Sequence, residues 1–258
     1  MRLFEVVFSP TGGTKKVCKI LSNEFPGEKI EIDLMNMDSS NSKGEITSDD
    51  ICLIAVPSFG GRVPVPAAES LKRMKGDHAK AVLIVVFGNR AYDDTLLELK
   101  DIAEKSGFVC IAAIAAIAEH SIMHQFGSGR PDKQDKEELK KYAVQIFHKL
   151  SEGQEFGDLV VPGKRPYREF GGLPLHPKAG RACNECGACA NVCPVGAIRK
   201  ENPRETDNKK CITCMGCAAV CPQNARKLNP VLLAAASSKM KKACSSRKEN
   251  EFRMEMYS

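Results

Sequence analysis

Two stretches of the chain, CNECGACANVCPVGA at residues 183–197 and CITCMGCAAVCPQNA at residues 211–225, match cysteine for cysteine at an offset of 28 residues. Each has the spacing C-x2-C-x2-C-x3-C-P. They hold eight of the 12 cysteines in the sequence. No secretory segment is apparent, and clustered cysteines in such a chain are more often metal ligands than disulfide partners. The repeat therefore predicts a metal-binding unit, which we place at residues 181–228.

The spacing favours iron–sulfur clusters over zinc. Three cysteines at x2 spacing wrap the chain around one corner of a cluster, and the fourth begins a short helix, where the following proline fits the first helical position. Zinc sites rarely need four cysteines so closely spaced, and a repeated Cys-Pro has no zinc rationale. A cluster whose irons all carry cysteine moves one electron and offers no substrate position. The segment is therefore interpreted as an electron relay, with no catalytic residue assigned.

The first 150 residues predict a parallel α/β sheet. Strand-like apolar runs occupy residues 2–8, 28–34, 50–56, 79–87 and 108–117. Helical patterns occupy residues 13–25, 64–75, 93–106 and 132–150. The inner runs are almost continuously apolar, as expected for parallel strands covered on both faces. Five such strands predict a flavodoxin-like doubly wound α/β domain over residues 1–150.

The loop after the first strand, SPTGGT at residues 9–14, predicts a phosphate site. It fits neither the P-loop nor the dinucleotide fingerprint, because G-x4-G-K-[ST] and G-x-G-x-x-G are both absent. Three hydroxyls and two glycines at a helix start can surround one terminal phosphate without a metal. The residues assigned to it are Ser9, Thr11, Gly12, Gly13 and Thr14.

Two more loops are expected beside this one, since ligands bind at the carboxyl ends of parallel strands. PSFGGRVP (57–64) follows the third strand and FGNRAYDD (87–94) follows the fourth. Each supplies an aromatic residue that could flank a flat tricyclic ring. The candidate cofactor-binding residues here are Ser58, Phe59, Gly60, Gly61, Gly88, Asn89 and Tyr92. His120 and His124 are weaker candidates for proton donors near a flavin substrate.

On these motifs the chain, over about residues 1–228, resembles the fused flavodoxin and two-[4Fe-4S] ferredoxin proteins of anaerobes. The resemblance implies non-covalent FMN and two [4Fe-4S] clusters. In bacterial-type two-cluster ferredoxins the fourth cysteine of each motif binds the other cluster. Carried over to this chain, cluster one takes Cys183, Cys186, Cys189 and Cys221. Cluster two takes Cys211, Cys214, Cys217 and Cys193.

The remaining parts of the sequence are interpreted as a connecting segment and a C-terminal tail. Residues 151–180 are rich in Gly and Pro and contain enough apolar residues to pack against one domain or both. Residues 229–258 form a basic tail, interpreted as a solvated or frayed helix, or alternatively as a docking strip for an acidic partner.

Composition narrows the function classes. The net charge of +6 favours redox partners with acidic surfaces, acting as low-potential donors or acceptors. No stretch resembles a nucleic-acid module, and no apolar run is long enough to span a bilayer. We expect a cytoplasmic electron-transfer protein that passes single electrons between the clusters and FMN. The alternatives are an FMN-dependent reductase of a small acceptor that uses the clusters as electron inlet, and a redox-sensing module.

Overall fold

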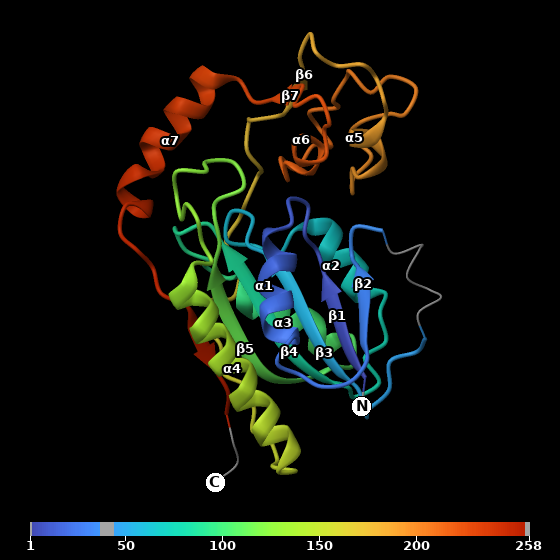
Figure 1. Cartoon of the computed structure of the whole chain (residues 1–258), viewed down its shortest axis with the longest axis vertical. Coiled ribbons are helices and arrows are strands. Elements are labelled where there is room, and N and C mark those ends of the chain that lie inside the picture. The colour runs from blue at the N-terminus through green and yellow to red at the C-terminus, as the bar shows by residue number, and fades with distance from the viewer. Residues whose placement is uncertain (1, 37–43, 256–258) are drawn as a thin grey trace.

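The computed structural model describes residues 2–36 and 44–255, and its first part is built on a parallel sheet (Figure 1). The parallel strands are β1 (Leu3–Val7), β2 (Lys29–Asp33), β3 (Ile51–Pro57), β4 (Lys80–Phe87) and β5 (Val109–Ile117). Their order in the sheet is β2-β1-β3-β4-β5. This is the flavodoxin-like order, with the reversal between β1 and β3. The predicted five-stranded parallel sheet is confirmed.

Helices cover both faces of the sheet, so the inner strands need no polar face. The helices are α1 (Gly13–Ser22), α2 (Val65–Lys72), α3 (Thr95–Lys105) and α4 (Lys133–Ser151). α1 packs beside α4 on one face, and α2 packs beside α3 on the other. Apolar residues of β3 and β4 are buried on both sides, which explains their unbroken apolar sequence. Among the described residues, no helix is both long and apolar enough to cross a bilayer.

The cysteine repeat of the sequence is also a repeat of backbone conformation. Two short helices, α5 (Ala188–Asn191) and α6 (Gly216–Ala219), follow the second cysteine of each motif. Residues at equivalent positions have positive φ in both halves, with Glu185 at 59° and Thr213 at 55°. The ends of the unit are joined by the antiparallel pair β6 (Lys178–Ala179) and β7 (Arg226–Lys227). Figure 1 shows the unit over the end of the parallel sheet.

The tail is more ordered than the sequence suggests, and it returns to the first domain. α7 (Pro230–Cys244) begins at Asn229, whose side chain accepts hydrogen bonds from the N–H groups of Val231 and Leu232. The chain then forms β8 (Glu251–Arg253), which pairs antiparallel with β5. Figure 1 shows α7 running down from the cysteine unit, and the chain after it continuing to this sheet edge. The exposed helix α7, in which only Cys244 is buried, agrees with the interpretation as a solvated helix, whereas the return of the chain to the sheet as β8 is not expected from the sequence; residues 256–258 lie outside the described part.

Buried polar groups fasten this returning segment. The Asn89 Nδ2 donates to the carbonyls of Cys244 at 2.8 Å and Ser246 at 2.9 Å, and its Oδ1 accepts from the Lys248 N–H at 3.1 Å. The Asn250 Oδ1 accepts from the Ile117 N–H at 3.1 Å. Asn89 is 5% exposed, so each lost bond would leave a buried group without a partner.

Replacing Asn89 with alanine should loosen the tail without unfolding the sheet. Leaving the partners of its amide unpaired should cost about 2 kcal/mol locally, which corresponds to roughly thirtyfold faster amide exchange in residues 245–253. Hydrogen–deuterium exchange with peptide resolution measures this directly. Asn23→Ala, at an exposed helix end, is the control and should leave the tail unchanged. Equal exchange of the tail in N89A and the wild type would contradict this role.

Candidate functional site

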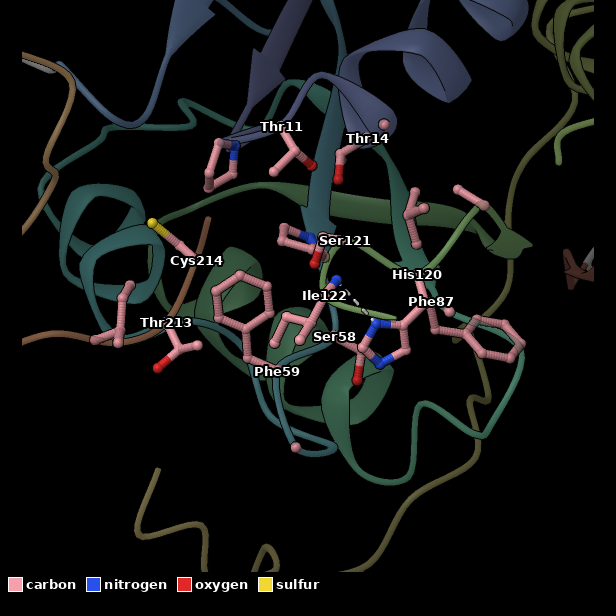
Figure 2. A pocket seen from close by; sticks show the side chains of 18 of the residues that line it. Thr11, Thr14, Ser58, Phe59, Phe87, His120, Ser121, Ile122, Thr213 and Cys214 are labelled. Carbon is pink, nitrogen blue, oxygen red and sulfur yellow. Dashed lines mark hydrogen bonds between the residues drawn. The ribbon is translucent and has the colours of Figure 1, made fainter. Parts of the chain in front are cut away.

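A cavity lies at the carboxyl ends of the parallel strands, where the loops after β1, β3, β4 and β5 meet (Figure 2). We call it the loop cavity. Residues of four loops line it: Pro10, Thr11, Gly13, Thr14, Ser58, Phe59, Gly60, Gly88, Ala118, Glu119, His120, Ser121 and Ile122. Figure 2 shows Thr11 and Thr14 on the side opposite Phe59. Parallel topology therefore brings together loops that are far apart in the sequence.

The first loop has the donor set of a phosphate site. Gly12 has φ of 87° as the residue before α1, a conformation that glycine adopts at little cost. α1 has neither a capping side chain at that position nor an acidic residue in its first turn. Within the described part of the chain, the hydroxyls of Thr11 and Thr14 make no hydrogen bond. Free hydroxyls at a helix start whose preceding residue has no capping side chain fit an anion that binds without a metal ion.

Ser9 and Gly12 shape this loop without lining the cavity. The Ser9 Oγ accepts from the Lys15 N–H at 3.0 Å, which ties the loop to the first turn of α1. The Gly12 N–H donates to the Ser9 carbonyl at 3.3 Å.

The second loop turns tightly and places one aromatic ring in the cavity wall. Phe59 and Arg62 exchange backbone hydrogen bonds of 3.0 and 3.2 Å across Gly60 and Gly61, which both have positive φ. The Phe59 ring faces the cavity in Figure 2. Gly61 does not line it and lies against Asp93 instead.

The structure places Asn89 and Tyr92 outside the loop cavity, contrary to the sequence interpretation. The side-chain amide of Asn89 makes its hydrogen bonds with the tail. Tyr92 is 7% exposed, its ring packs edge-on against Phe87 at 5.3 Å, and its hydroxyl donates to Glu251 at 2.7 Å. Burial, with the Glu251 carboxylate, raises the pKa of the Tyr92 phenol. Both residues were assigned to the cofactor site because they follow β4 in the sequence. In the structure their side chains form hydrogen bonds with the returning tail instead.

A second aromatic reaches the cavity from the connecting segment. Phe170 and Leu173 line the cavity and are each 38% exposed. The Phe170 ring lies so close to Gly60 that a Cβ there would be 2.2 Å from it. The segment is held in place because the Asp94 carboxylate accepts from the N–H groups of Lys164 at 2.9 Å and Arg168 at 2.8 Å. Apart from apolar residues in a Gly-rich segment, the sequence held no signal for this placement.

His120 is a neutral lining residue. Its Nδ1 accepts from the N–H groups of Ile122 at 3.1 Å and Met123 at 3.2 Å, so its proton resides on Nε2. Burial, with the nearby His124, lowers the pKa of His120 to about 4. The imidazole at neutral pH can therefore donate a hydrogen bond but holds no extra proton. His124 is exposed, pairs with Glu119 and does not line the cavity.

The eight repeat cysteines border two further cavities, four to each. Cysteine cavity one is bordered by Cys183, Cys186, Cys189 and Cys221. Cysteine cavity two is bordered by Cys193, Cys211, Cys214 and Cys217. Each set takes three residues from one motif and the fourth cysteine from the other. Four cysteines are the donor set of a [4Fe-4S] cluster.

Backbone donors also point at the sulfurs. The Ala197 N–H donates to the Cys193 Sγ at 3.2 Å, and the Ala225 N–H donates to the Cys221 Sγ at 3.3 Å. Within residues 2–36 and 44–255, no three His, Cys, Asp or Glu side chains gather tightly enough to hold a single metal ion. This spacing does not fit a mononuclear zinc site, whose ligands lie about 2 Å from one ion.

One segment borders both kinds of cavity. Ile212, Thr213 and Cys214, which we call the wall segment, line the loop cavity and cysteine cavity two alike. Figure 2 shows Thr213 and Cys214 beside Phe59. The Thr213 hydroxyl donates to the Leu175 carbonyl at 2.7 Å, which anchors the wall segment to the connecting segment.

Comparison with known proteins identifies the cysteine unit. Residues 182–226 match the family model described as a 4Fe-4S dicluster domain. A search of curated proteins finds no match.

The first domain is similar to flavodoxins among solved structures, at low identity. A Streptococcus pneumoniae TIGR4 flavodoxin is 13% identical, with a TM-score of 0.40, over 58% of this chain and 99% of that one. A Fusobacterium nucleatum flavodoxin bound to flavin mononucleotide is 12% identical, with a TM-score of 0.40, over 59% and 98%. Since both TM-scores are low, the fold assignment depends on the observed strand order. The chain joins an α/β domain with the flavodoxin strand order to a 4Fe-4S dicluster domain.

Proposed function

We propose that this protein transfers single electrons between two [4Fe-4S] clusters and an FMN bound in the loop cavity. The observation that carries this proposal is the wall segment, because Cys214 borders both the loop cavity and cysteine cavity two. Redox centres bound in these two cavities would be separated from each other by only a few residues.

FMN fits the donor set of the loop cavity. Its phosphate would lie at Thr11, Gly13 and Thr14, where hydroxyls and the start of α1 supply donors. Its ring would lie against Phe59, with the backbone of Ser58 and Gly60 beside it. Bound FMN would supply a centre that exchanges one or two electrons.

The cavities suggest an order for the relay. Cluster two, in cysteine cavity two, is next to the loop cavity, and cluster one would be the outer centre. Cys186, which borders cysteine cavity one, is exposed, so a partner protein could approach cluster one. Exposed Arg181 and Arg204 lie in the same unit, and the Arg204 Nη1 donates to the Cys183 carbonyl at 3.0 Å. Basic groups there suit a redox partner with an acidic surface.

The order is tested by removing one cluster at a time. Cys214→Ala should lower the iron content and slow flavin reduction by a low-potential one-electron donor protein by at least about 100-fold, because intramolecular delivery is lost. Anaerobic stopped-flow absorbance follows clusters and flavin together. Cys110→Ala removes a buried thiol near the far end of β5 and should retain eight irons and the wild-type rate.

Two further outcomes decide between models. Cys186→Ala should leave cluster two in place and weaken delivery from the partner protein. If C214A loses its cluster and the flavin is still reduced at the wild-type rate, the wall segment is not the electron route.

FMN binding is tested at the phosphate loop. Thr14→Val keeps the shape of this buried side chain but removes its hydroxyl. Losing one hydrogen bond to a charged group costs about 1.5–3 kcal/mol, so FMN should bind roughly 10- to 100-fold more weakly. Fluorescence titration of FMN into flavin-depleted protein with full iron content measures the Kd. Thr14→Ser should restore most of the affinity, and equal Kd values for T14V and the wild type would place the phosphate elsewhere.

A reductase of a small acceptor is a second candidate function. The neutral His120 supplies a hydrogen-bond donor in the loop cavity, and the exposed Phe170 and Leu173 leave apolar surface at its edge. FMN-dependent turnover of a small acceptor in the absence of any partner protein would favour this function over a carrier role.

A further inference from the structure

Arg226 is a buried cation beside cysteine cavity one. It lies on β7, five residues after Cys221, and is 4% exposed. Together with the four cysteines and Pro203, it lines the cavity in which we propose that cluster one binds. Burying a guanidinium is costly unless its charge and its N–H groups are compensated.

The protein compensates Arg226 only in part. Its Nη1 donates to the Thr206 hydroxyl at 2.7 Å and the Pro177 carbonyl at 3.3 Å, and its Nη2 donates to the Pro203 carbonyl. In the part of the chain that the structure describes, its Nε has no hydrogen-bond partner, and no carboxylate pairs with it. These partners are neutral, and the carboxylate that lines the same cavity, Glu185, is exposed and pairs with Arg204 instead.

A cluster in cysteine cavity one would supply a counter-charge to Arg226. Four thiolates give such a cluster a net negative charge, and reduction by one electron makes it more negative. A fixed positive charge nearby stabilises the reduced state more than the oxidised state. The residues that line cysteine cavity one therefore fit a bound cluster. The charge of Arg226, which no carboxylate in the described part of the chain pairs with, supports this independently of the cysteines.

The repeat places no such charge at the other cavity. The residue 28 positions before Arg226 is Ile198, which is also 4% exposed and lines cysteine cavity two. The two halves of the unit thus differ, at equivalent positions, by a cation in one and an alkyl group in the other. Thr206 and Pro177, which accept hydrogen bonds from Arg226, also border cysteine cavity two, and the Arg226 charge acts on Cys211 and Cys217 there as well as on Cys221, so both clusters feel it. Only cysteine cavity one is lined by Arg226 itself.

From this asymmetry we infer that Arg226 raises the reduction potential of cluster one above that of cluster two. This inference depends on the proposed pair of clusters, and it adds the direction in which they differ. The outer cluster then holds an electron more stably than the cluster beside the loop cavity. An electron that arrives from a partner resides on cluster one until the inner centre accepts it.

The experiment is an EPR-monitored redox titration of the full-length, anaerobically purified protein. Arg226→Met keeps an unbranched apolar stem, although a shorter one, and removes the charge. At a fixed potential it should lower the ratio of reduced to oxidised cluster one about tenfold, which for a one-electron couple is about 59 mV. Arg226→Lys, which keeps the charge, should stay closer to the wild type.

Arg204→Met is the matched control. It removes the same charge from a residue that contacts the same motif, but Arg204 is exposed and its charge is screened by water and salt. The ratio for cluster one should change less than about twofold. A shift in R204M as large as in R226M would show an effect of total charge and overturn the role of burial. An unchanged midpoint of cluster one in R226M, with eight irons present, would also overturn it.

A second measurement does not depend on changing Arg226. Cys214→Ala leaves cluster one as the centre to be titrated, and Cys186→Ala leaves cluster two. Cluster one should show the higher midpoint potential, and equal or reversed midpoints would overturn the inference. Neither result depends on flavin reduction, so failure here is separable from failure of the proposed electron route.

Discussion

The close contact between the wall segment and the loops of the parallel sheet is the constraint on which the site depends. Pro10 follows β1, and its Cβ and carbonyl oxygen each come within 3.3 Å of the position that a Cβ on Gly216 would occupy. Thr213 is a β-branched residue with φ of 55°, a conformation that costs roughly 1–2 kcal/mol. The hydrogen bond from its buried hydroxyl to Leu175 offsets part of this cost. The strained backbone conformation of Thr213 thus occurs in the segment that lines both the loop cavity and cysteine cavity two.

Two other segments keep that contact in register. The connecting segment forms hydrogen bonds with Asp94 at the start of α3. The tail forms hydrogen bonds with Asn89 and joins the sheet as β8. The dicluster unit is therefore attached to the α/β domain before and after its own sequence. A flexible tether would set only an average distance between two redox centres. Attachment at both ends fixes which cysteine cavity lies beside the loop cavity.

The sequence predicts the parts of this structure that depend on local pattern. Unbroken apolar runs predict the buried strands, and the resemblance to bacterial-type two-cluster ferredoxins implies the two cysteine sets that the structure gathers. It does not predict β8, because three residues with one apolar side chain, Phe252, carry no strand signal. That side chain is placed by stacking on Tyr142 at 4.8 Å, a contact between distant segments. Asn89 and Tyr92 were misassigned for the same reason, since their partners lie beyond residue 243.

The differences between the two cysteine motifs show where the dicluster unit meets the other domain. In the first motif, Glu185 is exposed and Gly187 has open space around it. Their equivalents in the second motif, Thr213 and Met215, keep the same positive φ although neither is glycine. Thr213 is buried, and Met215 packs against a cluster of residues that includes Ile122 and Phe126 from the loop after β5. A buried β-branched side chain and a methionine in this costly backbone conformation are explained by the contacts they make. An internal repeat that diverges at such positions indicates which half is the interface, and here it is the half that carries the wall segment.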